Sequence, residues 1–152
     1  MRESFIISDT DVAPGTRAVI NVPLPKLSSH TSMNMPLHVI HGRRQGPVLF
    51  LSAAIPGDEL NGIEIIRRIL AMKSLAKLSG TLVAIPVVNA YGLIQHSRYL
   101  PDRRDLNRSF PGSEGGSLAA RLANLFMEEI VSKCTHGIDL HTGAVNRTNL
   151  PQ

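Results

Sequence analysis

Apolar and polar residues along the chain form short blocks that predict its secondary structure. Residues 16–23 (TRAVINVP) alternate and are rich in Val and Ile, and residues 36–41 form a second short apolar run, so we expect two strands. Residues 48–55 form an uninterrupted apolar run of strand length, which is typical of a buried central strand. Residues 42–46 (GRRQG) are predicted to form a turn before it.

Two later segments have the period of a helix. Residues 61–73 place Ile63 and Ile66 on one face of an amphipathic helix. Residues 117–133 repeat this period, and Ser117 is the predicted N-cap because a hydroxyl there accepts a hydrogen bond from the first turn.

Two more strands and one long loop complete the pattern. Strands are predicted at residues 82–88 (LVAIPVV) and 137–141 (GIDLH), and Pro86 indicates an edge or a bend in the first of them. Residues 89–116 have no clear period but carry many charges. A loop of this length in a compact domain is usually functional.

The order of these blocks predicts an α/β fold with a mixed, largely parallel sheet flanked by helices. Residues 16–152 are expected to form one domain, and residues 1–15 to be loosely ordered. Nothing in the sequence has the length of a membrane span or the pattern of a secretory signal. We therefore expect no membrane partner.

Composition and charge narrow the functional classes only a little. The chain of 152 residues is 43% hydrophobic and 18% charged, which is typical of a globular domain. Its formal net charge of +4 is mild, which argues against nucleic acid as a partner. The single cysteine, Cys134, excludes an intrachain disulfide and fits a cytoplasmic setting.

Polar residues that are candidates for catalysis or metal binding follow two of the predicted strands. Glu59 comes shortly after the central strand, and His141 ends the last one. Because carboxyl ends of parallel strands meet at one edge of a sheet, we expect Glu59 and His141 to lie together there. A carboxylate and an imidazole form part of a zinc site, which needs three protein ligands and a water position. Asp139 should share the face of His141 and orient its ring.

Four runs at these positions resemble the succinylglutamate desuccinylase/aspartoacylase family. They are GDELNG, the segment from Asn89 through Gly92 to Arg98-Tyr99, DLNRSFPG and DLHTG, in family order and over residues 16–152. The resemblance implies a zinc carboxypeptidase-like fold with one zinc ion per chain. It also implies a zinc-dependent hydrolase, a deacylase whose small-molecule partner is an N-acyl amino acid such as succinylglutamate or N-acetylaspartate.

The resemblance assigns roles to five residues. Glu59 and His141 match two metal ligands of the family. Arg98 matches the catalytic residue that polarises the scissile carbonyl, and a fixed cation suits the charge that develops there. Asn107 and Arg108 match the residues that hold the substrate carboxylate, for which a guanidinium is well shaped.

Two departures from the family pattern change these expectations. Pro56 stands where the family has its first metal-binding histidine, and proline has no side-chain donor. Family members are roughly twice as long with a general-base glutamate in their second half, and no Asp or Glu follows His141 here. We therefore expect the N-terminal half of the fold, with zinc bound weakly or not at all. A truncated domain should also expose apolar surface and self-associate.

Three functions remain open on these grounds. The first is the zinc-dependent deacylase, and the second is a metal-poor relative that binds a carboxylate ligand without turnover, which Pro56 favours. The third, a nucleic-acid or phosphate binder, is weakest because the charged loop has no aromatic run for base stacking. Without the resemblance, the loop arginines would be read as solvated or as paired with Asp102 and Asp105. The sequence determines neither the acyl amino acid nor the oligomeric state.

Overall fold

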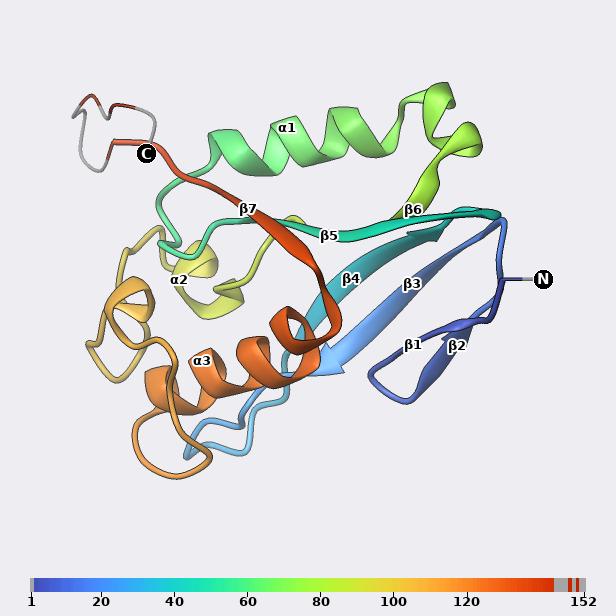
Figure 1. The fold of residues 1–152 in the computed structure, drawn as a ribbon. Coiled ribbons are helices and arrows are strands. Elements are labelled where there is room, and N and C mark those ends of the chain that lie inside the picture. Colours follow the sequence, from blue (N-terminus) through green and yellow to red (C-terminus); the bar gives the residue numbers. More distant parts are fainter. Residues whose placement is uncertain (1, 144–147, 149, 151–152) are drawn as a thin grey trace.

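A computed structural model describes residues 2–143, 148 and 150 (Figure 1). A small hairpin is formed by β1 (Phe5–Ile7) and β2 (Thr10–Val12). The strands of the main sheet are β3 (Thr16–Pro23), β4 (Asn34–His41), β5 (Arg44–Ala53), β6 (Ser79–Ile85) and β7 (His136–Leu140). The α-helices are α1 (Asn61–Leu70), α2 (Ala90–Ile94) and α3 (Leu118–Glu129). Short 3-10 turns lie at Lys73–Lys77, Leu106–Arg108 and Val131–Lys133.

The main sheet is mixed, as predicted. Within the described residues its strand order is β3-β4-β6-β5-β7. β4 runs antiparallel to both β3 and β6, whereas β5 runs parallel to β6 and β7. Helix α1 covers one face, and α2 and α3 lie on the other (Figure 1). The predicted α/β fold with flanking helices is therefore confirmed, and β6 rather than β5 occupies the middle of the sheet.

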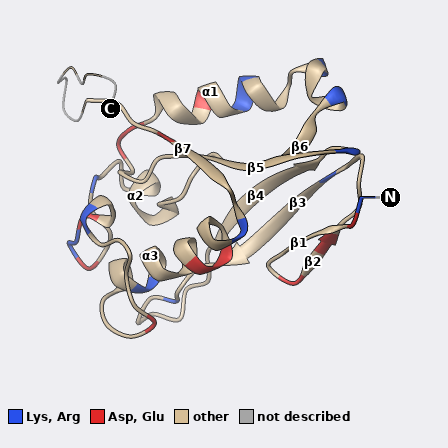
Figure 2. Ribbon diagram, viewed as in Figure 1, with Lys and Arg blue, Asp and Glu red and all other residues tan. Residues whose placement is uncertain are grey.

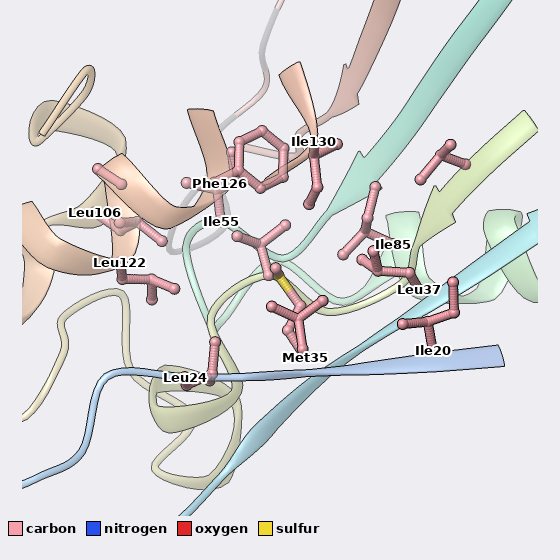
Figure 3. Close-up of a cluster of buried hydrophobic side chains, with 14 of the residues drawn as sticks. Ile20, Leu24, Met35, Leu37, Ile55, Ile85, Leu106, Leu122, Phe126 and Ile130 are labelled. Carbon is pink, nitrogen blue, oxygen red and sulfur yellow. The ribbon is translucent and has the colours of Figure 1, made fainter. Parts of the chain in front are cut away.

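Two apolar cores hold the helices against the sheet. The larger core lies on the side of α3, where Met35, Leu37, Ile55, Leu122 and Phe126 meet from different elements (Figure 3). The smaller core lies beneath α1 and contains the helix residue Ile66 with residues of β4, β5 and β6: Ile40, Leu51, Ala53, Leu82 and Ala84. Burial of these apolar side chains is the main favourable contribution to the fold.

Several element boundaries differ from the prediction for local reasons. β5 begins at Arg44, because residues of the predicted turn 42–46 already pair with β6 through a register shift before Val48. Such a bulge lets an irregular segment join a sheet. β6 ends at Ile85, so Pro86 lies in a bend after the strand and removes no ladder hydrogen bond. Of the two predicted alternatives, an edge or a bend, the structure shows the bend.

The helical predictions agree more closely with the structure. Ser117 is the N-cap of α3, and its side chain accepts a hydrogen bond from the backbone N–H of Ala120 at 3.1 Å. The first helix ends at Leu70, earlier than predicted. The long segment 89–116 contains α2 and a 3-10 turn, so it has more local structure than its lack of period indicated.

The N-terminal residues differ from the expectation of loose order. Ile7 and Val12 of the hairpin are fully buried in the larger core. The guanidinium of Arg2 donates hydrogen bonds to the carbonyls of Gly42 and Gly80 at 2.6 and 2.9 Å. These contacts join the N-terminal residues to distant parts of the chain, so the local pattern of residues 1–15 does not predict them.

A broad groove of about 570 Å³ lies between α1 and the neighbouring face of β3 and β4. Its apolar lining includes Val19, whose surface is 63% exposed, and Ile63 and Leu70 of the helix. The predicted exposure of apolar surface by truncation and the predicted self-association both stay predictions. No helix in the described part of the chain is both long and apolar enough to cross a membrane.

Cys134 is expected to react slowly with thiol reagents. The residue is partly buried against the larger core, and this burial raises the pKa of its thiol to about 11. Because the thiolate is the reactive form, labelling by a disulfide reagent at pH 8 should be roughly 100-fold slower in the native chain than in guanidinium. The native rate should still rise between pH 8 and pH 10. Equal rates in both solvents would contradict this assignment.

Candidate active site

The two strand-end motifs meet at the carboxyl edge of the sheet. β5 and β7 are parallel neighbours, and Ala53 at the end of one pairs with Leu140 at the end of the other. His141 follows β7 directly, and Glu59 follows β5 after a short turn. Nδ1 of His141 lies 2.9 Å from Oε2 of Glu59. The predicted juxtaposition of Glu59 and His141 is confirmed.

The turn that carries Glu59 is held by backbone contacts with α2. A Cβ added to Gly57 would lie 2.1 Å from the carbonyl carbon of Gly92, so the two segments touch without room for a side chain. The fully buried Asn89 accepts a hydrogen bond from the N–H of Gly92 at 2.8 Å and donates one to the carbonyl of Ile55 at 3.1 Å. This amide therefore joins the turn after β5 to the first turn of α2.

Glu59 is nearly fully buried, and its carboxylate has three polar partners. The backbone N–H of Thr142 donates to Oε2 at 2.9 Å, where His141 also makes its contact. Nη1 of Arg98 lies 3.9 Å from Oε1. Such partners are what a buried carboxylate needs, because an unpaired charge away from water is costly.

His141 lies between two carboxylates. Its Nε2 contacts Oδ2 of Asp139, as predicted from their spacing, while Nδ1 faces Glu59. Ser52 donates to the other oxygen of Asp139 at 2.7 Å, which fixes that carboxylate from the neighbouring strand. The hydrogen bond that the His141 ring donates to Asp139 raises the pKa of His141 above its ordinary value, and Glu59 adds to this effect. Asp139 also holds Nε2, which leaves Nδ1 directed at Glu59.

Arg98 reaches the same site from the charged loop, which Figure 2 shows as mixed blue and red segments. Its Nε donates to Oδ2 of Asp105 at 2.7 Å, and this hydrogen bond raises the pKa of Arg98. Asn107 and Arg108 lie on the exposed 3-10 turn that follows Asp105. Nε of Arg108 is 3.6 Å from Oδ2 of Asp105. Arg98 is thus beside Glu59, and the other two predicted substrate residues are connected to it through Asp105.

Three residues of the site received no role from the sequence, although Asn89 and Asp105 lie within the motifs quoted above. Asp105 had a detectable signal, because an Asp directly before a short polar turn is a typical N-cap. Ser52 was visible as a polar residue inside an apolar strand. Asn89 precedes a helix, but its second hydrogen bond, to the distant carbonyl of Ile55, has no local signature.

A carboxylate oxygen of Glu59 and a ring nitrogen of His141 are the kinds of atom that bind zinc, and they would supply two of the three protein ligands that a catalytic zinc site needs. Oε2 of Glu59 and Nδ1 of His141 face each other, which suits a carboxylate and an imidazole on one ion. Pro56 is buried and offers no donor at the third position. Within the described ranges, no group of three His, Cys, Asp or Glu residues is arranged to hold a metal ion. Oδ1 of Asp58 is buried without a hydrogen-bond partner there, so the site contains one unsatisfied acceptor.

Comparison with known proteins links this geometry to one group of enzymes. The family model of the succinylglutamate desuccinylase/aspartoacylase catalytic domain matches residues 45–152. An N-alpha-acetyl-L-2,4-diaminobutyric acid deacetylase from Halomonas elongata is 29% identical over 117 residues, which are 76% of this chain and 34% of the relative. The chain therefore spans about a third of the length of this curated relative.

Solved structures have the same fold over most of the chain. An aspartoacylase family protein from Mesorhizobium loti superposes with a TM-score of 0.76 at 26% identity, covering 86% of this chain and 41% of its own. The product-bound ectoine utilization protein EutE (DoeB) from Ruegeria pomeroyi gives a TM-score of 0.71 at 28% identity, covering 84% of this chain and 40% of its own.

Proposed function

Because the chain belongs to the succinylglutamate desuccinylase/aspartoacylase family, we propose that its site serves a zinc-dependent deacylase acting on N-acyl amino acids. The chain spans only 34% of the curated relative, so the activity of a whole enzyme is part of the proposal. The proposal depends on the observation that Glu59, His141 and Arg98 lie next to one another. The two proposed metal ligands, Glu59 and His141, and the cation of Arg98 lie at the same edge of the sheet.

Each residue of the site would have a distinct role. Glu59 and His141 would hold the zinc ion, which when bound supplies a Lewis acid that polarises a carbonyl and acidifies water. Asp139 holds Nε2 of His141 and so keeps Nδ1 directed toward Glu59, where the ion would bind. Arg98 presents positive charge beside Glu59, where it would stabilise the oxygen of the scissile carbonyl.

Substrate recognition would fall to the exposed turn beside Arg98. The Arg108 side chain is 84% exposed, so its guanidinium is free to take a carboxylate in the bidentate geometry that suits it. Asn107 is exposed next to it. An N-acyl amino acid carries both groups that this arrangement would recognise, an amide carbonyl and a carboxylate.

A second function is favoured by Pro56 and is the binding of such a ligand without turnover. The third ligand position has no donor, because proline carries no side-chain nitrogen or oxygen. The positive charge of Arg98 and the proposed carboxylate binding by Asn107 and Arg108 do not depend on a metal ligand at position 56. The predicted absence of nucleic-acid and membrane partners stays a prediction.

Zinc and ligand titrations test the proposal and separate its two forms. We expect weak zinc binding that disappears in His141→Ala, and binding of N-acetyl-L-2,4-diaminobutyrate that weakens at least tenfold in Arg98→Ala, because a charged contact is lost. Calorimetry measures both, and release of the free amine measures turnover, which we do not expect from the 152-residue chain.

The matched control is His136→Ala, which removes an exposed imidazole from the same strand. It should change neither titration. Zinc binding that survives in His141→Ala would contradict the metal assignment. Ligand binding that survives in Arg98→Ala would contradict the substrate assignment.

A further inference from the structure

Asp105 contacts all three residues to which the proposed function gives a role in handling substrate. Its Oδ2 accepts a hydrogen bond from Nε of Arg98 at 2.7 Å and lies 3.6 Å from Nε of Arg108. Its Oδ1 accepts from the backbone N–H of Asn107 at 3.0 Å. The Asp105 carboxylate is only 8% exposed, so these contacts take the place of water.

The backbone of Asp105 is fixed as firmly as its side chain. It forms an isolated antiparallel bridge with Tyr99, the residue next to Arg98. Its carbonyl accepts a hydrogen bond from the hydroxyl of Ser109 at 2.8 Å. The loop is thus closed at Arg98 on one side and at the 3-10 turn on the other, and the carboxylate lies between these two points.

We propose that Asp105 is a positioning residue that aims Arg98 at the reacting carbonyl and holds the carboxylate-binding turn in register with it. The inference rests on the proposed function. Arginine has many rotamers, and a hydrogen bond at Nε fixes the plane of its guanidinium. Because Asp105 takes Nε, the terminal nitrogens stay available, and Nη1 is the one that lies 3.9 Å from Glu59.

A general structural role for the Asp105 charge does not account for this arrangement. Asp102, in the same loop, shows what such a role looks like: its oxygens accept from the backbone N–H groups of Arg104 and Ala119 at 3.1 and 2.9 Å. It has no ion pair with an arginine among the described residues. Asp105 instead joins two side-chain cations to the turn that carries Asn107.

The test is a double-mutant cycle between Asp105 and Arg98, with N-acetyl-L-2,4-diaminobutyrate as the calorimetric probe. Asp105→Asn keeps an oxygen for the N–H of Asn107 but loses the charge and an acceptor for Arg98. We expect it to weaken probe binding roughly tenfold. In the Arg98→Lys background the same change should cost less than about threefold, because the side chain it positions is already altered. Asp102→Asn is the matched control and should change binding less than about threefold.

A second readout does not need a ligand. In protein with ¹⁵N-labelled arginine, the Nε–H resonance of Arg98 should be shifted and protected from exchange, and Asp105→Asn should abolish both properties. Asp102→Asn should leave them unchanged. If the unchanged chain binds no probe, the proposed function fails, while this resonance still decides whether Asp105 holds Arg98.

Three results would overturn the inference. One is an Arg98 resonance that Asp105→Asn does not move. Another is a loss of probe binding as large in the Arg98→Lys background as in the unchanged chain, since independent effects add. The third is an Asp102→Asn variant that weakens binding as much as Asp105→Asn, which would mean that only loop structure or net charge matters.

Discussion

Replacing Pro56 by His should raise the affinity of the chain for zinc by roughly 100-fold, because one ligand's share of the roughly 10–16 kcal/mol of a four-ligand structural zinc site is on the order of 3 kcal/mol. The backbone N–H of Glu59 donates to the carbonyl of Pro56 at 3.1 Å, so the turn already brings position 56 close to Glu59. Calorimetric titration with zinc at fixed pH measures the gain. Hydrolysis should not appear, since no Asp or Glu follows His141 as a general base.

The matched control for this substitution is Pro56→Ala. It removes the proline ring and adds no donor, so its zinc affinity should equal that of the unchanged chain. The gain in Pro56→His should also vanish when His141→Ala is added. If Pro56→His binds no more tightly than Pro56→Ala, the turn does not direct position 56 toward His141.

Phe126→Ala should cost about 3–5 kcal/mol of unfolding free energy, the range for deleting a large aromatic side chain from a core. Phe126 is nearly fully buried, and its ring makes edge-on contacts with Phe50 of β5 and Phe110 of the charged loop, at centroid distances of 5.7 and 5.8 Å. The side chain thus connects α3, the sheet and the loop that carries Arg98. Denaturant unfolding followed by circular dichroism measures the loss.

Ile94→Ala is the control for this prediction, because Ile94 is large and apolar but 69% exposed. Its effect should stay within about 0.5 kcal/mol, as for surface substitutions in general. A loss of similar size in both variants would show that Phe126 does not occupy a rigid core site.

Local sequence patterns were sufficient for the fold class and for the main elements. The alternation in residues 16–23 gives β3 with the predicted bounds, and the hydroxyl of Ser117 caps α3 as expected. These features depend on residues close in sequence, which is why periodicity and capping rules predict them. The strand order and the bulge in β5 depend on pairing with distant strands, and no local rule predicts either.

The candidate site divides in the same way. The sequence indicated that Glu59 and His141 follow strand ends and that Asp139 shares a face with His141, and the structure brings all three together. It also identified Arg98, Asn107 and Arg108, through motifs whose roles stay predictions. The sequence named Asp105 as one of two candidate partners of the loop arginines, but it did not indicate that this one carboxylate contacts Arg98, Asn107 and Arg108 together.

The sequence alone determined the fold class, the main secondary-structure elements and which chemical groups the candidate site contains. It could do so because periodicity, turn residues and motif spacing are properties of residues close together in the chain. What only the tertiary structure decided is which groups touch. Ser52 of β5 donates to Asp139 of the neighbouring strand β7, and Asn89, before α2, donates to the carbonyl of Ile55 in the turn after β5. The physical reason is that a buried polar atom takes whichever partner the packed chain brings within about 3 Å, and packing depends on the whole core at once.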